Sequence, residues 1–311
     1  MDLFRCIRCN HQKLNPEGDA LACPACQARY PIERGIPRFV PAENYAGSFG
    51  FQWNTHRTTQ LDSHTGLPIS GDRLFAVTGW PRDLSGQHVL EAGSGAGRFT
   101  KVLAATAASL YSFDYSSAVE ANYANNGHYR NLTLFQGDIF DIPVAPQRFD
   151  KVICLGVLQH TPDPAKAFAS LAAQVKPGGQ IVIDVYRKGP VTLLHWKYLL
   201  RPITRRMDQQ RLYRMIDTWV PRLIPITQAL RRTFGRHGAR LSPIAEYSDL
   251  GLPPDTNRRW AILDTFDMYA PAHDHPQSVE GVRRWFEDAG LEQIEVGNGP
   301  HGLVGRGRRG V

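Results

Sequence analysis

The sequence predicts an α/β fold built on a doubly wound, mostly parallel sheet, and three observations support this prediction. From residue 87 onward, short apolar runs alternate with stretches of helical spacing, the pattern of a parallel sheet covered on both faces. A glycine-rich turn at residues 93–97 follows the first of these runs. Two further apolar runs close the chain after a last helical stretch. The 311 residues leave room for additions to such a sheet.

Composition excludes several classes of protein. The chain is 42% hydrophobic and 21% charged, without low-complexity tracts or a fixed repeat, which excludes a disordered chain, collagen and a coiled coil. The most apolar run, Val191 to Leu200, is interrupted by His195 and Lys197 and falls short of the roughly 20 residues that a membrane span needs. The first ten residues lack the apolar segment of a secretory signal. We therefore expect a cytosolic protein with no transmembrane helix.

Four of the five cysteines lie in two pairs near the N-terminus. The pairs are Cys6 with Cys9 and Cys23 with Cys26, each with two residues between its members, and 13 residues separate the pairs. This spacing is typical of a zinc ribbon, in which two tight turns bring four thiolates to one tetrahedral metal. An all-cysteine set leaves no open coordination position, so we expect a structural zinc. Disulfides are one alternative, which the expected cytosolic location disfavours, and an empty or degenerate ribbon is the other.

The run from Tyr30 to Pro37, YPIERGIP, extends the ribbon pattern. With the cysteines it resembles the small zinc-ribbon proteins that activate RNA and protein methyltransferases, a ribbon that is also found fused ahead of methyltransferase domains. The resemblance covers about residues 3–41. The fifth cysteine, Cys154, lies in an apolar run and is interpreted as a core residue.

Seven strands are expected after residue 86. They are His88–Ala92, Leu110–Asp114, Leu132–Gln136, Lys151–Leu155, Gln180–Tyr186, Leu291–Val296 and Gly302–Gly305. The intervening helices are expected at Arg98–Ala108, Ser117–Asn125, Ala165–Val175 and Ser278–Ala289. The run Lys176-Pro177-Gly178-Gly179 should end the third helix, while Ser278 should cap the fourth and Gly290 should follow its end.

The glycine turn indicates which cofactor the sheet binds. The first strand ends in Glu91-Ala92-Gly93-Ser94-Gly95-Ala96-Gly97-Arg98, and such a turn brings backbone N–H groups close to a nucleotide cofactor. The dinucleotide fingerprint needs a small residue where Arg98 stands, and Glu91 would repel a pyrophosphate. S-adenosylmethionine has no phosphate, and its ammonium and sulfonium groups attract a carboxylate. The turn therefore favours S-adenosylmethionine over NAD or FAD.

The next two strands also end in acidic residues, at Asp114 and at Gln136-Gly137-Asp138-Ile139. With E-x-G-x-G-x-G, F-D-x-V-I and K-P-G-G, residues 87–186 and the last strands resemble the Rossmann-like class I S-adenosylmethionine-dependent methyltransferases. The resemblance implies that Glu91, Gly93 and Gly95 line the methionine and adenosine moieties. It also implies that Asp114 holds the ribose, and that Asp138 and Ile139 meet the adenine.

Histidines are the candidate catalytic residues. Methyl transfer mainly requires placement of the nucleophile, with a base only when that nucleophile carries a proton. After the fourth strand the chain lacks both the N-P-P-Y or D-P-P-Y motif of enzymes that methylate adenine or glutamine amides and the P-C motif of cytosine-C5 enzymes. His160 in this loop is a candidate base or substrate contact, with loop packing as the alternative. His273 and His275 are further candidate bases, and a metal site formed with Asp274 is an open alternative.

An aromatic cluster follows the ribbon and includes Tyr45, Phe49 and Trp53. Because a sulfonium attracts aromatic faces, Trp53 is a candidate lid over the cofactor, with simple packing of a linker as the alternative. Residues 49–66 resemble the segment that precedes the core in methyltransferases of polysaccharide and secondary-metabolite pathways, and this favours the lid.

Residues 187–240 are strongly basic. They contain 13 Lys or Arg against Asp208 and Asp217, a net charge of +11, while the whole chain carries +7. Arginines here would suit an acidic group on a small substrate or glycan carrier, an RNA, or an anionic membrane surface. A solvated helical cap is the alternative. Pro202, Pro221 and Pro225 predict several short helices rather than one long surface helix.

Together these features predict four parts. We expect a zinc ribbon at 1–41, a linker and cofactor lid at 42–85, a methyltransferase core at 86–186 and 261–311, and a basic helical insertion at 187–260 that caps the substrate. The leading hypothesis is an S-adenosylmethionine-dependent methyltransferase with structural zinc, acting at oxygen on a small molecule or a lipid- or nucleotide-linked sugar. An rRNA methyltransferase is the first alternative, and a non-catalytic adaptor that binds the cofactor is the second. Peripheral membrane contact stays open.

Overall fold

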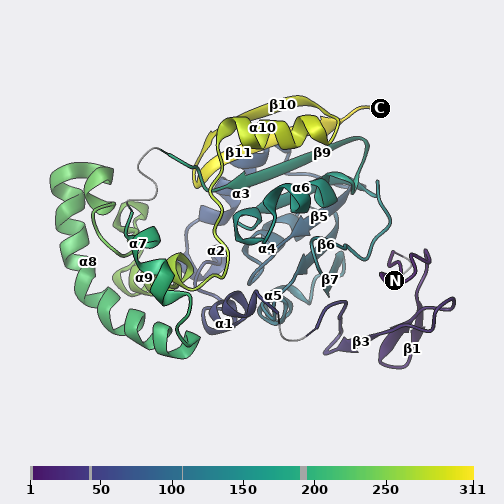
Figure 1. Cartoon of the computed structure of the whole chain (residues 1–311), viewed down its shortest axis with the longest axis horizontal. Coiled ribbons are helices and arrows are strands. Elements are labelled where there is room, and N and C mark those ends of the chain that lie inside the picture. Colours follow the sequence, from purple (N-terminus) through teal and green to yellow (C-terminus); the bar gives the residue numbers. More distant parts are fainter. Residues whose placement is uncertain (1–2, 42–43, 107, 190–194) are drawn as a thin grey trace.

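The computed structural model describes residues 3–41, 44–106, 108–189 and 195–311. Its centre is a seven-stranded sheet in the order β10-β11-β9-β8-β5-β6-β7 (Figure 1). The strands are β5 (His88–Ala92), β6 (Ser109–Asp114), β7 (Leu132–Gln136), β8 (Phe149–Leu155), β9 (Val175–Val185), β10 (Leu291–Gly299) and β11 (Gly302–Arg309). Strands β5 to β9 pair in parallel, and β11 runs antiparallel to both of its neighbours. The predicted fold class is confirmed.

Both faces of the sheet are buried, which explains why its strands are almost continuously apolar. Neighbouring residues point to opposite faces: Val89 and Ile153 belong to one hydrophobic cluster, and Leu90 and Val152 belong to the other. The covering helices are α4 (Arg98–Ala104), α5 (Val119–Asn126), α6 (Pro164–Ala172) and α10 (Val279–Asp288). Helix α10 is capped as predicted, because Ser278 Oγ accepts a hydrogen bond from Gly281 N at 3.0 Å.

Two predicted helix ends are wrong. The helix expected to run to Ala108 ends at Ala104, where the Thr106 hydroxyl donates to the Leu103 carbonyl at 2.6 Å. The helix expected to reach Val175 ends at Ala172, and Val175 instead begins β9. Strand β9 therefore includes the K-P-G-G run. Its pairing with β8 shifts register between Phe149 and Lys151, and this irregularity makes room for the extra residues of the run.

The N-terminal residues form a separate small sheet beside the edge strand β7 (Figure 1). Its strands are β1 (Asn15–Glu17), β2 (Ala20–Ala22), β3 (Arg29–Glu33) and β4 (Ile36–Pro37). Phe39 N donates to the Gln136 carbonyl of β7 at 2.9 Å. The Phe4 ring lies 5.1 Å from that of Phe39 and 5.2 Å from that of Phe135 between ring centres. The ribbon and one face of the large sheet therefore share a hydrophobic core.

The segment between ribbon and sheet is helical. It contains α1 (Gly47–Thr55), α2 (Asp62–Thr65) and α3 (Ile69–Thr78), and residues 42 and 43 of the expected linker lie outside the described part of the chain. The Asp62 carboxylate accepts hydrogen bonds from Ser70 N at 2.7 Å and Gly71 N at 2.9 Å, so it holds the start of α3.

The basic insertion forms a helical layer at the end of the molecule opposite the ribbon (Figure 1). Its helices are α7 (Trp196–Thr204), α8 (Gln209–Ala239) and α9 (Pro254–Tyr269); residues 190–194, which include part of the apolar run at Val191 to Leu200, lie outside the described residues. Helix α9 continues to Tyr269, past the predicted end of the insertion at residue 260. No helix in the described ranges has the length and apolar character to cross a membrane.

The prediction that prolines divide the insertion into short helices is wrong. Helix α7 contains Pro202, and α8 runs through both Pro221 and Pro225 before Gly235 departs from helical geometry. A proline inside a helix costs about 3 kcal/mol. The buried stripe of α8, which begins with Leu212 and packs into a cluster with α9, offsets this cost, since each fully buried apolar side chain contributes roughly 1.5–3 kcal/mol.

Candidate active site

A cavity of about 810 Å³ opens at the carboxyl ends of β5, β6, β8 and β9. Ligands of open α/β sheets bind at this edge. The predicted site residues in its wall are Trp53, Gly93, Gly95, Asp114, Ile139 and His160. The insertion completes the wall with residues such as Lys197, Tyr198 and Arg240. Most of the residues predicted at the strand ends therefore surround one cavity.

The glycine turn leaves no room for side chains. Gly93 has φ of +73°, and a Cβ there would lie 2.3 Å from a methyl carbon of Val157. A Cβ at Gly95, where φ is +53°, would lie 3.1 Å from the Trp53 indole. Val157 on one side and Trp53 of α1 on the other therefore leave no room for a side chain at these two positions.

Asp114 ends β6 with both carboxylate oxygens engaged. Its Oδ2 accepts from Gly95 N at 2.8 Å, and its Oδ1 accepts from Ser116 N at 2.9 Å and Ser116 Oγ at 2.7 Å. Burial raises the pKa of Asp114 despite these bonds, which act in the opposite direction. Oδ2 still offers one further acceptor position, so the group can take a hydrogen bond from a neighbouring hydroxyl.

Ile139 lies in the cavity wall, whereas Asp138 beside it does not. The Asp138 carboxylate is half-buried and accepts from Phe140 N at 2.9 Å. Asp138 therefore lies at the edge of the expected adenine position, and its role stays a prediction.

Glu91 is also absent from the cavity wall. Its Oε2 accepts from the Thr100 hydroxyl at 2.5 Å and from the Ser112 hydroxyl at 2.8 Å. Burial raises the pKa of Glu91 to about 7. The carboxylate thus joins β5, β6 and α4 beneath the glycine turn, and its direct contact with a cofactor ammonium stays a prediction.

Helix α1 covers the mouth of the turn. Beside Trp53, it contributes Phe49, whose ring centre lies 5.1 Å from that of His160. Gln52 lines the cavity with a buried amide whose oxygen and nitrogen have no hydrogen-bond partner among the described residues. The hydroxyl of Ser94 in the turn is also buried without a hydrogen-bond partner among the described residues. Buried polar groups normally have partners, so these atoms fit a polar ligand such as S-adenosylmethionine.

His160 lies in the cavity wall and has one ring nitrogen without a hydrogen bond. Its Nδ1 lies 3.1 Å from the His273 carbonyl oxygen, which can only accept, so Nδ1 carries the proton. Its Nε2 is buried and has no hydrogen bond, and the nearest carboxylate oxygen, Asp267 Oδ2, is 4.0 Å away. Burial lowers the pKa of His160, which keeps the ring neutral.

His273 and His275 do not line the cavity. The His273 ring packs edge-on against Tyr45, and its backbone carbonyl is what fixes His160. His275 is exposed, and its backbone N–H donates to the Gln159 carbonyl at 2.8 Å. Asp274 forms an ion pair with Lys197 at 2.9 Å. Among the described residues, the four cysteines are the group arranged to hold a metal ion.

Two groups of cavity residues were not among those predicted from the sequence. Tyr186 OH donates to Asp267 Oδ2 at 3.1 Å, facing His160. Deeper in the wall, Asp264 accepts from Trp260 Nε1 at 3.0 Å and Gln60 Nε2 at 3.0 Å, and burial raises the pKa of Asp264 to about 7. Tyr186 ends the fifth predicted strand, a position that could have drawn notice. Asp264 and Asp267 lie on α9. The predicted boundary after residue 260 divides this helix between the insertion and the core.

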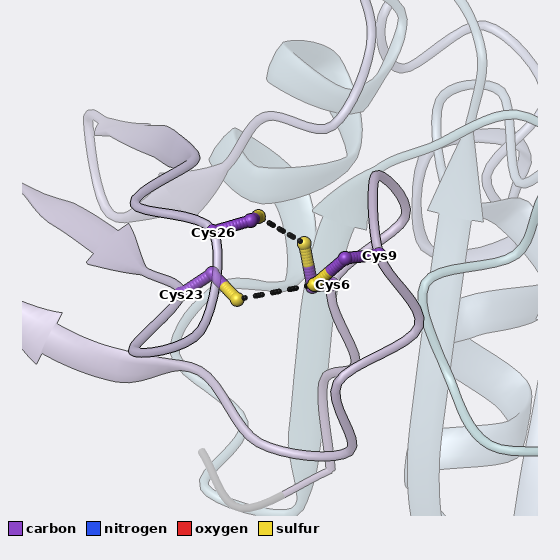
Figure 2. A group of neighbouring side chains, drawn as sticks. All are labelled: Cys6, Cys9, Cys23 and Cys26. Atoms are coloured by element: carbon purple, nitrogen blue, oxygen red, sulfur yellow. Dashed lines mark hydrogen bonds between the residues drawn. The ribbon is translucent and has the colours of Figure 1, made fainter.

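The four N-terminal cysteines converge from two turns, as Figure 2 shows. The Sγ atoms of Cys6 and Cys26 are 3.5 Å apart, as are those of Cys9 and Cys23, and all four lie within 4.8 Å of one another. Zinc–sulfur bonds of about 2.3 Å in a tetrahedron put the sulfurs about 3.8 Å apart, so the set fits a zinc ion. All four are free thiols, so the disulfide alternative is not supported. Cys154 is buried, as expected of a core residue.

Known proteins that are similar to this chain include methyltransferases. Residues 90–183 match the family described as a methyltransferase domain. An uncharacterized Synechococcus protein, syc1184_c, is 29% identical over 237 residues, which cover 69% of this chain and 49% of that protein. A Coxiella burnetii ubiquinone biosynthesis O-methyltransferase is 34% identical over 107 residues, which cover 34% of this chain and 46% of that enzyme. The chain thus spans about half the length of these relatives.

Among solved structures, one chain of a complex that contains the Haloferax volcanii Trm112 methyltransferase activator aligns at 14% identity and a TM-score of 0.48. The alignment covers 88% of the present chain and 100% of the other. The order of the sequence motifs, the sheet topology and the match at residues 90–183 agree with one another. Residues 90–183 are therefore a methyltransferase domain of the class I S-adenosylmethionine-dependent type.

Proposed function

We propose that this protein is an enzyme that methylates a hydroxyl oxygen on a small molecule or on a lipid- or nucleotide-linked sugar. The observation that carries the proposal is the buried Nε2 of His160, a cavity-wall residue, which has no hydrogen-bond partner among the described residues. A hydroxyl loses a proton when it is methylated, so its methylation benefits from a positioned base. Some relatives are named ubiquinone biosynthesis O-methyltransferases, and this name is consistent with methylation at oxygen.

The cofactor contacts follow from the wall. Asp114 would accept a hydrogen bond from a ribose hydroxyl at Oδ2, and Ile139, with Asp138 beside it, would lie against the adenine. Gly93 and Gly95 would bring the backbone close, and Trp53 on α1 would cover the site. When bound, S-adenosylmethionine supplies an electrophilic methyl group. The unpaired amide of Gln52 and hydroxyl of Ser94 support this placement, because each needs a polar partner.

His160 then accepts the substrate proton at Nε2. The His273 carbonyl holds the tautomer, and the Asp267 carboxylate stabilises the imidazolium that forms, since an opposite charge about 4 Å away favours the charged ring. Tyr186 orients Asp267 through its hydroxyl. The aromatic side chains of α1 shield the reacting groups from water.

The insertion would act as the substrate cap. Lys197, Tyr198 and Arg240 all come from its helices or their ends and lie in the cavity wall. The guanidinium of Arg240 suits an acidic group on the substrate, while the ammonium of Lys197 is paired with Asp274. A cavity of about 810 Å³ is of the size that holds small molecules. The ribbon would hold one structural zinc through Cys6, Cys9, Cys23 and Cys26.

The test is methyl incorporation from labelled S-adenosylmethionine into separated RNA, lipid and small-metabolite fractions. We expect label in the lipid or small-metabolite fraction. His160→Gln, which fills a similar volume without a base, should lower kcat about 10²- to 10⁴-fold with KM little changed. His275→Gln is the matched control, because His275 is exposed and outside the wall.

Other outcomes would contradict the proposal in different ways. Label in RNA would replace the proposed substrate with the rRNA alternative. An absence of label in every fraction, together with tight binding of S-adenosylhomocysteine by calorimetry, would favour the non-catalytic adaptor. An undiminished kcat in His160→Gln would remove the base from the mechanism while leaving the enzyme class intact.

A further inference from the structure

Helix α7 has its polarity inverted. Lys197 and Arg201 are each 7% exposed, whereas Leu199 is 55% and Ile203 is 68% exposed. Trp196 at the start of the helix is 42% exposed. A helix on a water-exposed surface normally buries its apolar side chains and exposes its charged ones. The outward face of α7 is therefore suited to a surrounding other than water.

The inversion is fixed by specific contacts. Lys197 Nζ lies 2.9 Å from the Asp274 carboxylate and 4.1 Å from the centre of the Tyr186 ring. Arg201 Nη2 donates to the Pro271 carbonyl at 2.9 Å, and its Nη1 donates to the Met268 carbonyl at 3.3 Å. Rotating α7 to bury its apolar face would break these bonds and leave two buried cations unpaired, which is costly.

The apolar face extends beyond the helix. Trp196 Nε1 donates to the Leu241 carbonyl at 2.8 Å, and Leu241, just after α8, is 61% exposed. We call Trp196, Leu199, Ile203 and Leu241 the α7 patch. Two of its members adjoin residues of the cavity wall in sequence: His195 and Lys197 flank Trp196, and Arg240 precedes Leu241. The α7 patch therefore borders the cavity.

The surroundings of the α7 patch are cationic. Residues 195–241 contain eleven Lys or Arg and two acidic residues, and Arg205 and Arg206 at the end of α7 are exposed. A second copy of the chain would bring the same positive charge to this face and would be repelled. Exposed Trp, Leu and Ile beside arginines match the interface of an anionic bilayer, where apolar side chains enter the acyl boundary and cations meet headgroups.

We propose that the α7 patch and its neighbouring arginines dock this protein on an anionic lipid bilayer, with the cavity opening beside the membrane surface. The contact is peripheral. It needs neither cofactor nor methyl transfer, so it can be measured whether or not the proposed reaction occurs.

The test is sedimentation of the full-length protein with vesicles of phosphatidylcholine alone or with about 30% phosphatidylglycerol. We expect binding to the anionic vesicles that weakens as salt rises, because the Debye length shortens. Leu199→Ser, Ile203→Ser and Leu241→Ser combined should weaken binding about tenfold or more, since three apolar side chains no longer enter the bilayer. Arg205→Glu with Arg206→Glu should remove the preference for anionic lipid.

The matched control is Met215→Ser with Ile226→Ser on α8. Both residues are exposed apolar side chains, at 43% and 57%, but neither belongs to the α7 patch or to the cavity wall. This variant should bind vesicles as the unmodified protein does. Each variant is also checked by its thermal unfolding midpoint. Failure of the unmodified protein to bind anionic vesicles would overturn the proposal and leave an acidic protein as the partner. Equal loss in the control, or none in the triple variant, would also overturn it.

Discussion

Burial shifts the pKa of several individual side chains in this protein. His160 and His56 both have a lowered pKa because the charged ring is poorly solvated, while Glu91 and Asp264 have a raised pKa for the same reason. All four groups are therefore pushed toward their neutral forms. For His160 this is useful, because a base must be unprotonated before it can act.

Asp114 offers a residue-level test of cofactor binding. Replacing Asp114 with Ala should weaken binding of S-adenosylhomocysteine by roughly 1.5–3 kcal/mol, the range for a hydrogen bond to a charged group. Calorimetry measures this, with Asp114→Asn as the control for the contact that Asp114 makes with Gly95 N. Asn keeps the shape and one acceptor oxygen, so it should lose less affinity. Unchanged affinity in both variants would exclude Asp114 from ribose binding.

His56 provides a prediction about pH and stability. It is buried against Tyr213, with His56 Nε2 2.9 Å from the Tyr213 hydroxyl, and burial lowers the pKa of His56 to about 4. The unfolded chain binds this proton near pH 6.5 and the folded chain does not. The stability contributed by the neutral ring is therefore present above about pH 6.5 and is lost as pH falls toward 4.

The loss should reach about 2 kcal/mol at about pH 5 relative to neutral pH. Urea unfolding at the two pH values, compared between the unmodified protein and His56→Gln, isolates this contribution from those of the buried carboxyls, which have the opposite sign. The variant should show the smaller acid loss. Parallel curves for the two proteins would mean that His56 titrates normally.

At the scale of elements, apolar runs located the strands and residue chemistry located the turns between them. Strands β5 and β7 agree with their predicted bounds because each is a short, buried run that ends at a polar residue or turn. The prolines of α8 led to the wrong prediction of short helices. A proline indicates the local cost to the helix backbone, but not the packing of Leu212 and its neighbours against α9 that offsets it. Asp267 and Tyr186, which face His160, are bonded to each other although they lie 81 positions apart in the sequence. No local sequence pattern predicts such a contact.

The turn between β5 and α4 yields an element-level prediction. Gly93→Ala places a methyl 2.3 Å from a Val157 methyl carbon, at a φ that costs an L-residue about 1–2 kcal/mol. We expect lower affinity for S-adenosylhomocysteine and a lower free energy of unfolding. Val157→Ala removes the clash but not the backbone strain, so the double variant should recover part of both losses. Full recovery would show that strain is absent, and no recovery would show that Val157 is not the obstacle.

At the scale of the whole molecule, the ribbon and the sheet behave as one body. Phe4, Phe39 and Phe135 pack in a cluster that also contains Cys6 and Cys23. The cysteine spacing predicted a metal site, but nothing in the first 41 residues indicated that their apolar side chains would join the core of a sheet that begins at residue 88. That arrangement depends on shape complementarity between distant segments.

Removing the metal should therefore affect more than the N-terminus. Elemental analysis should find about one zinc per chain. Cys23→Ser, or chelation, should lower the midpoint of the main thermal transition by about 5 °C or more, because loss of the metal loosens a shared core. Cys154→Ala is the matched control and should keep its zinc, since Cys154 lies in β8 away from the other cysteines. A metal-free protein with an unchanged midpoint and an equally protease-resistant N-terminus would contradict this prediction.

The ribbon also covers the free border of β7, since Phe39 N and the Arg38 side chain bond Gln136, whose backbone would otherwise face solvent. An uncovered outer strand is a template for pairing with another chain. Chelated protein should therefore self-associate as its concentration rises, beginning at residues 132–136. Loss of turnover after metal removal would then reflect aggregation of folded sheets, and it would be reversed by dilution together with zinc.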